Sequence, residues 1–511
     1  KLSQTKYQIK KMLISKILEN VSAKKSYSKD IDINNISDDS RKIGKGDMFV
    51  AVCGAVADGH AFVETAIGNG AVAVVVNRSS DVPCLAKYPD IQVIEVEDTA
   101  KALGEIAANF YGRPSESLNL VGITGTNGKT TTATLLYKLF LGMGFGAGLI
   151  STIKNYICLE ERDTINTTPN VLEINRLLAD MVRAGCDYCF MEVSSHATIQ
   201  QRIAGLTFRG AVFTNLTQDH LDYHKTMDNY RDAKKLFFDH LPQTAFALTN
   251  ADDRNGNFML QNTKAQRYTY STRSLADFKT KIIENTFEGM TLQMETNVTD
   301  KGKERYEVST PFVGSFNAQN LTAVFGAAAL LCQGKGIDNQ TILTKLSELS
   351  PVSGRFEVIR MAGISAIVDY AHTPDALKNV LSTINDVKSP DSKVVTVVGC
   401  GGDRDKTKRP IMAQEAAAQS DTLVLTSDNP RTEDPQSILD DMVKGLSKDR
   451  LEDTIVIVDR RQAIKTACKL AKSGDIVLVA GKGHENYQIV GKEKHHFDDK
   501  EEVIVALNSK R

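Results

Sequence analysis

The sequence has no excess of charge of either sign, and this absence narrows the class of partner. Among 511 residues, 62 are Lys or Arg and 63 are Asp or Glu, so the formal net charge is −1. Such a balanced chain has no electrostatic feature that would attract nucleic acid or an anionic membrane. We therefore expect no nucleic acid and no membrane partner, and a small-molecule substrate fits the composition better.

Long apolar runs and a cysteine framework are also missing. No window approaches the roughly 20 consecutive apolar residues that a membrane-spanning helix needs. The 8 cysteines are scattered, and Cys186 and Cys189 fall in a run typical of a buried strand, where positions three apart point to opposite faces. We expect structural cysteines without disulfides, and hence a reducing, cytoplasmic location.

At the start of the chain, Ile9, Met12, Leu13 and Ile17 are spaced as one face of an amphipathic helix.

Short apolar strands alternate with helical patterns almost throughout, which is typical of parallel α/β sheets. Breaks near Pro114 and Pro351 predict three domains: a smaller N-terminal α/β domain (1–113), a central mononucleotide-binding domain (114–350) and a C-terminal Rossmann-like α/β domain (351–511). Alternating patterns in RYTYST, MTLQMET and RYEVSTPFV, between residues 267 and 313, predict an antiparallel addition to the central sheet. In the C-terminal domain, polar segments follow successive strands, so they are expected to line a crevice at the carboxyl ends of those strands.

The run GITGTNGKTTT at 122–132 resembles a Walker A phosphate loop, but Ile123 occupies the position of its first glycine. The backbone N–H groups of Thr126 to Thr130 are expected to wrap phosphate oxygens at a helix N-terminus. Lys129 is expected to neutralise the β and γ phosphates, and the Thr130 hydroxyl to bind Mg²⁺. The pattern predicts an ATP site with the residues Gly125, Thr126, Asn127, Gly128, Lys129, Thr130 and Thr131.

This variant loop resembles that of the Mur ligase family and its folylpolyglutamate synthase relatives, which are amide-forming ATPases. The resemblance extends over essentially the full chain. Further segments similar to Mur signatures follow in order: MEVSSHA (191–197), FTNLTQDHLDYH (213–224), GSFNAQN (314–320), SGRFE (353–357), VDYAHTPDAL (368–377), GCGGDRDKTKRP (399–410) and SDNPRTEDP (427–435).

The resemblance implies transfer of the ATP γ-phosphate to a carboxylate, followed by attack of an amine on the acyl phosphate. It implies Mg²⁺ ligands at Thr130, Glu192 and His220, and a CO₂-derived carbamate on Lys234. Taken alone, Glu192 could cap a helix, His220 could be a core histidine, and Lys234 could be a solvated helix lysine like Lys235. For the base, ribose and phosphates of ATP, the matching residues are Asn317, Arg355, Asp369, Tyr370 and His372.

The branch that the motifs resemble implies UDP-MurNAc-L-Ala-D-Glu as the acceptor and a monomeric enzyme. Ser40 is the expected contact of the UDP group, with the charge of Arg41 nearby, although Ser40 could simply cap a helix. The matching positions for the muramoyl dipeptide are Asn166, Thr167, Thr168, Ser194, Gln200 and Arg202.

The segment DNPR resembles the recognition motif for meso-2,6-diaminopimelate, because Arg431 can form a fork on the second carboxylate that lysine lacks. The implied pocket consists of Arg404, Asp428, Asn429, Pro430, Arg431, Gly481 and Glu485, with Glu485 suited to a substrate amine. A surface ion pair of Arg431 with Glu433 or Asp434 is the ordinary alternative. Two other functions stay open: the same reaction with L-lysine or another diamino acid, and a nucleotide-switched binding protein.

Overall fold

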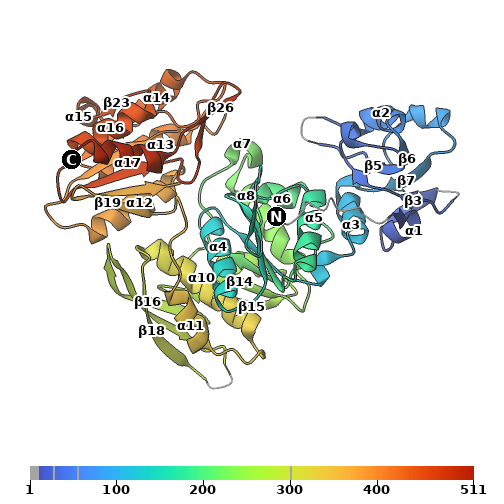
Figure 1. Ribbon diagram of the computed structural model, residues 1–511, viewed down its shortest axis with the longest axis horizontal. Helices are drawn as coiled ribbons and strands as arrows, with labels where there is room; N and C mark the ends of the chain where they lie inside the picture. The colour runs from blue at the N-terminus through green and yellow to red at the C-terminus, as the bar shows by residue number, and fades with distance from the viewer. Residues whose placement is uncertain (1–10, 27–28, 55–56, 300–301, 511) are drawn as a thin grey trace. The chain divides into compact units, whose positions relative to one another are not determined.

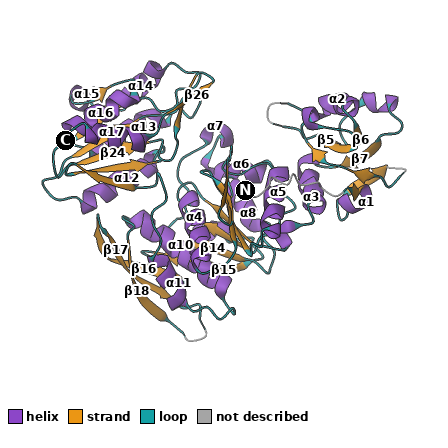
Figure 2. Cartoon of the chain, in the orientation of Figure 1, coloured by secondary structure: helices purple, strands orange, loops and turns teal. Residues whose placement is uncertain are grey.

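The computed structural model describes residues 11–26, 29–54, 57–299 and 302–510, whose helices and strands are labelled in Figure 1 and coloured by type in Figure 2. The chain forms two compact units. The first comprises Lys1–Gly122 with Phe145–Gly210, and the second comprises Ile123–Gly144 with Ala211–Arg511. The domain boundaries expected after residues 113 and 350 stay a prediction.

The first unit begins with a five-stranded sheet of order β2-β7-β6-β5-β4, in which every pair is parallel except β2 with β7. Alternate apolar residues of its strands point to opposite faces, so one face packs against α1 and α3 and the other against α2. The elements are β1 (Met12–Leu13), α1 (Ile14–Ile17), β2 (Ala23–Ser26), β3 (Asp32–Ile33), β4 (Ile36–Ser37), η1 (Ser40–Lys42), β5 (Asp47–Val50), η2 (Gly59–Phe62), α2 (Val63–Gly68), β6 (Ala71–Asn77), η3 (Pro83–Lys87), β7 (Gln92–Val96), α3 (Thr99–Phe110) and η4 (Pro114–Glu116).

The amphipathic helix expected at the start of the chain is wrong for Met12 and Leu13. These residues form β1, which pairs antiparallel with β3, and within residues 11–26 the helix covers only α1. Backbone pairing with a distant strand has overridden the local helical periodicity. Ile9, also assigned to that helix face, lies outside the described residues.

The remaining strands of the first unit follow the order β11-β10-β9-β12-β8. Strands β12 and β9 are parallel, whereas β10 pairs antiparallel with both neighbours. Cys189 lies in β12 and, like Cys186 before it, is buried, as expected for structural cysteines; Cys186 Sγ is 3.4 Å from Cys158 Sγ. The elements are β8 (Asn119–Thr124), β9 (Ala147–Ile150), β10 (Asn155–Ile157), β11 (Glu160–Arg162), α5 (Val171–Arg183), β12 (Tyr188–Glu192) and α6 (Ser195–Ile199).

The second unit contains the strand order β13-β14-β15-β16-β17-β18. The antiparallel addition consists of β16, β17 and β18, whereas β15, which contains RYTYST, pairs parallel with β14; its expected antiparallel direction is therefore wrong. Alternation reveals a half-exposed strand but not its direction. The elements are α4 (Lys129–Gly142), β13 (Gly210–Phe213), α7 (Leu221–His224), α8 (Met227–Asp239), β14 (Phe246–Asn250), α9 (Gly256–Met259), β15 (Gln266–Ser271), β16 (Phe278–Thr286), β17 (Gly289–Thr296), β18 (Glu304–Thr310), α10 (Ser315–Cys332) and α11 (Asn339–Ser347).

The same unit ends in a six-stranded sheet of order β19-β20-β24-β21-β22-β23. Its alternating apolar residues pack on one face against α12, α13 and α14 and on the other against α16 and α17, as in a doubly wound fold (Figure 2). The elements are β19 (Glu357–Met361), β20 (Ile364–Asp369), α12 (Pro374–Val387), β21 (Val394–Val398), α13 (Lys408–Gln419), β22 (Thr422–Leu425), α14 (Pro435–Val443), α15 (Lys448–Glu452), β23 (Ile455–Val456), α16 (Arg460–Leu470), β24 (Ile476–Ala480), β25 (Tyr487–Val490), β26 (Glu493–His496) and α17 (Asp499–Asn508).

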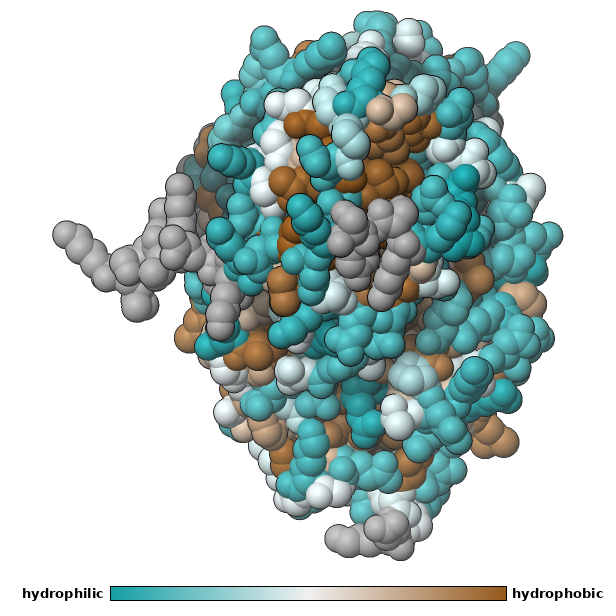
Figure 3. Space-filling view, turned by 90° about the vertical axis from the view of Figure 1, so that its right-hand side faces the viewer, coloured by the Kyte–Doolittle hydropathy of each residue, from teal (hydrophilic) through white to brown (hydrophobic). Residues whose placement is uncertain are grey.

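None of the helices in the described residues combines the length and apolar composition needed to cross a bilayer. On the face drawn in Figure 3, hydrophilic side chains predominate and hydrophobic ones gather in a smaller patch in the upper half.

A buried ion pair ties together the carboxyl ends of two strands in the C-terminal sheet. The side chains of Arg460 and Asp499 are both fully buried and form two hydrogen bonds of 2.7 Å. Arg460 also donates to the carbonyl oxygens of Ser427, at 3.2 Å, and Ala480, at 3.0 Å. These carbonyls lie just after β22 and at the end of β24, so Arg460 fixes the starts of the polar segments that follow both strands.

Arg460→Met is expected to lower the free energy of unfolding of the C-terminal sheet by about 3–5 kcal/mol, because it leaves Asp499 buried and unpaired. Arg461→Met is the matched control. Its exposed pair with Glu502 contributes at most about 1 kcal/mol. Urea unfolding followed by circular dichroism measures both variants, and equal midpoints for the two would contradict this role.

Candidate active site

The phosphate loop begins where β8 ends, which explains the missing first glycine. Ile123 is a fully buried residue of that strand. The backbone turns instead at Gly125 and Gly128, whose φ angles are 148° and 87°. A Cβ at Gly125 would lie 1.9 Å from Thr214 Oγ1, and one at Gly128 would lie 2.5 Å from Asn320 Oδ1. Both positions therefore require glycine, and α4 starts directly afterwards.

Two N–H groups of this loop are already used within the protein. Thr126 donates to the carbonyl oxygen of Asn215 at 2.8 Å, and Asn127 donates to the side-chain Oδ1 of the same residue at 2.9 Å. These two hydrogen bonds fix the shape of the loop. Phosphate binding by the N–H groups from Thr126 to Thr130 stays a prediction. Thr130 and Thr131 are buried in the first turn of α4.

Two lysine amines meet at one carbonyl of the loop. The Nζ atoms of Lys129 and Lys234 each lie 2.9 Å from the carbonyl oxygen of Gly125. Burial, followed by the charge of Lys129, lowers the pKa of Lys234 well below its ordinary value of 10.5. Lys234 is thus no solvated lysine, and neither is its neighbour Lys235, which is buried and pairs with Asp239 at 2.5 Å.

His220 lies near the loop on the second unit, in a left-handed conformation with φ of 55°. Its side chain is 43% exposed, so the alternative of a core histidine is wrong. Its Nε2 is 3.3 Å from Oδ2 of Asp219. The sequence motifs had given Asp219 no role. Burial opposes ionisation of Asp219, but His220, His372 and Lys408 outweigh it and lower the pKa of this carboxyl to about 2. Asp219 therefore adds a fixed negative charge beside His220.

Glu192 belongs to a hydrogen-bonded cluster in the first unit. Its carboxylate Oε1 accepts the N–H of Thr152 at 2.7 Å, and its carbonyl oxygen accepts the hydroxyl of Thr168 at 2.8 Å. Glu192 is not a helix cap, because Ser194 caps α6 by accepting the N–H of Ala197.

Thr168 connects most of the residues assigned to the muramoyl dipeptide. Its Oγ1 lies 3.3 Å from Ser194 Oγ, and its carbonyl oxygen accepts from Arg202 Nη1 at 2.7 Å. Arg202 in turn donates to Oε1 of Gln200, and Thr167 Oγ1 accepts from Thr152. The structure thus brings Thr167, Thr168, Ser194, Gln200 and Arg202 together. The exposed Asn166 adds a carbonyl that accepts from Thr164.

Ser40 and Arg41 lie at the start of η1, also in the first unit. Asp39 is the N-cap of this turn, so the alternative that Ser40 is the cap is wrong. Ser40 is buried, and its carbonyl oxygen accepts from Asn69 Nδ2 at 2.9 Å. Arg41 is exposed and forms a fork on Asp39, with both N···O distances at 2.9 Å.

Residues assigned to ATP binding gather around Arg355. Its Nη2 donates to Thr130 Oγ1 at 3.2 Å, and its guanidinium lies 4.3 Å from the centre of the Tyr370 ring. The ring of His372 stacks edge-on against Tyr370, and its Nδ1 is 2.9 Å from the Tyr370 carbonyl oxygen. The carboxylate of Asp369 accepts the N–H groups of Phe356 and Ala371, at 2.6 and 2.7 Å, so its present role is to hold this turn.

A cavity of about 430 Å³ lies beside this group, and Asn317, the residue expected near the nucleotide base, lines it together with Phe356. Asn317 is held in the first turn of α10, where its Nδ2 donates to the carbonyl oxygen of Val313 at 2.9 Å. Its walls combine apolar side chains such as Phe287 and Phe312, which suit a flat aromatic ring, with the charged Glu288, Arg360 and Lys500.

The positive side of the expected amino-acid pocket forms around Gly401. A Cβ at this glycine would lie 2.9 Å from Arg431 Nη1 and 3.7 Å from Arg404 Cγ. Arg431 Nη1 donates to the carbonyl oxygen of Gly402 at 2.8 Å, whereas its Nε and Nη2 make no hydrogen bond to any described residue. The ion-pair alternative for Arg431 is wrong, because Glu433 pairs instead with Arg409 and Asp434 caps α14.

The negative side of the pocket follows β22 and β24. The N–H of Asn429 donates to Asp428 Oδ1 at 2.6 Å, and a Cβ at Gly481 would lie 2.7 Å from Asp428 Oδ2. Asn429 Nδ2 donates to Glu485 Oε2 at 2.8 Å. Burial and the charge of Asp428 raise the pKa of Glu485, while Lys482 lowers it. The sequence analysis missed Lys482, although its fully buried side chain belongs to this group. Pro430, which completes the motif, is buried.

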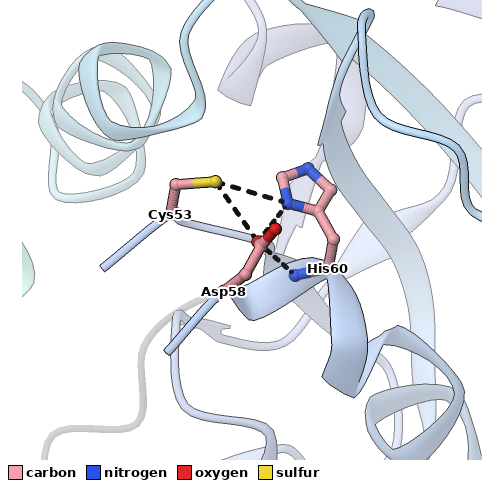
Figure 4. A group of neighbouring side chains, drawn as sticks. All are labelled: Cys53, Asp58 and His60. Atoms are coloured by element: carbon pink, nitrogen blue, oxygen red, sulfur yellow. Dashed lines mark hydrogen bonds and ion pairs between the residues drawn. The ribbon is translucent and has the colours of Figure 1, made fainter. Parts of the chain in front are cut away.

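Cys53, Asp58 and His60 form a separate group in the first unit that resembles a metal site (Figure 4). His60 Nε2 accepts the N–H of Asn77 at 2.9 Å, so the ring proton lies on Nδ1 and is donated to Asp58 Oδ1 at 2.6 Å. A metal ligand needs a lone pair at Nδ1, which this tautomer lacks. The group therefore anchors the loop after β5 to β6.

Models of three Mur domains match the chain: the Mur ligase family catalytic domain at residues 32–111, the Mur ligase middle domain at 123–328, and the Mur ligase glutamate ligase domain at 354–483. A Parabacteroides distasonis relative named UDP-N-acetylmuramoyl-L-alanyl-D-glutamate--2,6-diaminopimelate ligase is 55% identical over 476 residues, covering 93% of this chain and 94% of the relative. The chain belongs to the Mur ligase family. A Bacteroides thetaiotaomicron relative with the same name is 52% identical and covers 94% of this chain and 96% of its own length.

Solved structures agree with this membership. The structure of a ligase with the same name is 32% identical and has a TM-score of 0.68, covering 98% of this chain and 99% of its own. A UDP-N-acetylmuramoylalanyl-D-glutamyl-2,6-diaminopimelate--D-alanyl-D-alanyl ligase from Acinetobacter baumannii shares the fold, with 19% identity, a TM-score of 0.61 and coverage of 93% and 96%. The α/β class and three-domain Mur architecture expected from the sequence are confirmed.

Proposed function

We propose that this chain is an ATP-dependent ligase that joins meso-2,6-diaminopimelate to the D-glutamate γ-carboxylate of UDP-MurNAc-L-Ala-D-Glu in peptidoglycan synthesis. The observation that carries this proposal is the polar group after β21, β22 and β24, where two guanidinium groups and two carboxylates gather at one sheet edge. The names of relatives that are more than 50% identical support it.

The pocket suits a molecule that carries two carboxylates and two amino groups. The Nε and Nη2 groups of Arg431 are available for a fork on a carboxylate. L-lysine as substrate has no second carboxylate that could accept this fork. Asp428 and Glu485 complement an ammonium group. L-lysine is therefore the weaker candidate, because it would leave the charge of Arg431 uncompensated. The separate amino-acid pocket also disfavours a nucleotide-switched binding protein.

The chemistry requires two anions, a triphosphate and a carboxylate, to approach within bonding distance. Lys129 and Arg355 are the fixed cations of the second unit that offset this repulsion near the phosphate loop. The γ-phosphate is transferred to the carboxylate, ADP leaves, and the amine attacks the acyl phosphate with release of phosphate. Asn317 and the cavity beside it hold the base, whereas Asp369, Tyr370 and His372 support Arg355 and the ribose side of the site.

Thr130, Glu192, His220 and a carbamate on Lys234 are the proposed holders of Mg²⁺, an ion that prefers oxygen ligands. The buried Lys234 fits this role, because an amine with a strongly lowered pKa is uncharged and can react with CO₂. The ion supplies charge neutralisation at the transferred phosphate. Each of these residues holds its position through the contacts described above.

In the first unit, Ser40 and Arg41 are proposed to contact the UDP group, and the cluster around Thr168 is proposed to contact the muramoyl dipeptide. Asn166 extends that cluster toward solvent. Domains at 1–113, 114–350 and 351–511, a monomeric state and a cytoplasmic location complete the proposal.

Phosphate release is expected to require ATP, the nucleotide dipeptide and diaminopimelate together. Arg431→Ala should lower kcat/KM for diaminopimelate about 10- to 100-fold, the loss expected when a charge-assisted hydrogen bond is removed, with little change in KM for ATP. Arg461→Ala on α16 serves as the control. Wild-type-like use of diaminopimelate by Arg431→Ala, or a preference of the wild type for L-lysine, would refute the specificity argument.

Lys234 is expected to carry a carbamate. In ¹³C-bicarbonate, the wild-type protein and Lys235→Met should both show a carbamate ¹³C resonance, because Lys235 is an ion-paired neighbour. Lys234→Met should show none and should lose ligase activity. A resonance that persists in Lys234→Met would place the carbamate elsewhere.

A further inference from the structure

Lys482 lies in the turn between β24 and β25, beside Asn429 and Glu485 of the expected amino-acid pocket. Its side chain has no exposed surface, and its Nζ lies 3.2 Å from Asn429 Oδ1 and 3.2 Å from Glu485 Oε2. Lysine is almost never fully buried unless it is paired, because removing an ammonium group from water is costly. These two contacts stabilise it, together with the ring of Tyr487, whose centre lies 5.5 Å from Nζ.

The same contacts fix the orientation of Asn429. Its Oδ1 accepts both from Lys482 and from the N–H of Ile489, the latter at 2.9 Å. Two donors at this atom identify it as the amide oxygen, so Nδ2 must point to Glu485 Oε2. Lys482, Asn429 and Glu485 thus form a closed triangle, in which both partners of Glu485 engage the same carboxylate oxygen.

The other oxygen of Glu485, Oε1, makes no hydrogen bond to any described residue. Around it, Asp428 raises the pKa of Glu485 and Lys482 lowers it, whereas Arg460 nearby is already paired with Asp499. Tyr370 and Tyr487 also face Glu485, and both have raised pKa values. Two carboxyl groups thus share one lysine, an arrangement that complements one substrate ammonium.

We propose that Lys482 is a positioning residue for the amino-acid substrate: it locks Asn429 and Glu485 so that Glu485 Oε1 receives one ammonium group of a diamino acid. This inference rests on the proposed function and adds to it a residue that selects the charge of the substrate. Lys482 acts through Glu485 and does not itself contact the substrate.

Lys482→Met tests this role in the full chain, with Lys465→Met, an exposed position on α16, as the matched control. KM for diaminopimelate should rise at least about tenfold, the loss expected when a charge-assisted hydrogen bond no longer orders its partner. KM for ATP and for the nucleotide dipeptide should stay within about twofold of wild type, which a general loss of structure would not allow.

The pH profile gives a second readout. Lys482 lowers the pKa of Glu485, so its removal should let Glu485 keep its proton to higher pH. A protonated Glu485 cannot attract an ammonium group. The acidic limb of 1/KM for diaminopimelate should therefore move to higher pH in Lys482→Met, and Glu485→Gln should abolish that limb.

The Glu485→Gln background separates positioning from a purely structural role. In that background, adding Lys482→Met should raise KM for diaminopimelate by less than about threefold over Glu485→Gln alone, because the effects of two coupled residues are not additive. If Lys482→Met does not fold, Asn429→Asp is the second variant: it keeps the acceptor for Lys482, removes the donor to Glu485, and should raise the same KM alone.

Unchanged KM for diaminopimelate in a folded variant, or an equal loss for all three substrates, would overturn the proposal. The wild type in the same assay tests the function itself. If the wild type does not use diaminopimelate, the proposed function fails, whereas a normal wild type with an unaffected Lys482→Met refutes only the role of Lys482.

Discussion

The carbonyl oxygen of Gly125 receives two lysine amines, and this shared contact organises the chemistry of the second unit. Lys129 and Lys234 both approach it at 2.9 Å, in a place where burial already disfavours charge. Two ammonium groups at one buried carbonyl repel each other, so one of them must give up its proton most readily. Lys234 is the more deeply buried, and its pKa falls well below the ordinary value. The carbonyl of Gly125 thus places the amine of the loop lysine beside a second, readily deprotonated amine on α8.

A similar separation of charge shapes the C-terminal sheet. Arg404 and Arg431 flank Gly401, whereas Asp428 and Glu485 follow strands β22 and β24, which lie on either side of β21. The buried pair of Arg460 with Asp499 fixes where these segments leave the sheet. Both signs of charge are therefore presented along one sheet edge, as recognition of a zwitterion with two carboxylates requires.

The parallel sheets, the phosphate loop and the polar segments after the C-terminal strands could be predicted, because they depend on local pattern: apolar runs, glycine positions and strand ends. Contacts between distant residues could not. The helix lost at Met12 depends on pairing with Ile33, Asp219 depends on the charges of His372 and Lys408, and Lys482 depends on Asn429. One sequence feature could have drawn attention to Lys482 in AGKGHE: it lies between two glycines directly after a buried strand.

The same limit applies to residues that appeared suited to a metal. Cys53, Asp58 and His60 have suitable chemistry, but the N–H of Asn77 determines the tautomer of His60 and uses the group for structure. The sequence pattern identifies side chains whose chemistry suits a metal ion. Hydrogen bonds from neighbouring elements decide whether their lone pairs are available to bind one.

Isotope tracing of the acceptor oxygen tests most directly the central claim, that the carboxylate is phosphorylated before the amine attacks. The γ-carboxylate of the nucleotide dipeptide is labelled with ¹⁸O, the reaction is run with ATP and diaminopimelate, and the released phosphate is analysed by mass spectrometry. An acyl phosphate pathway predicts that each phosphate carries one ¹⁸O from the acceptor. Unlabelled phosphate, with every label retained in the peptide product or in water, would contradict it.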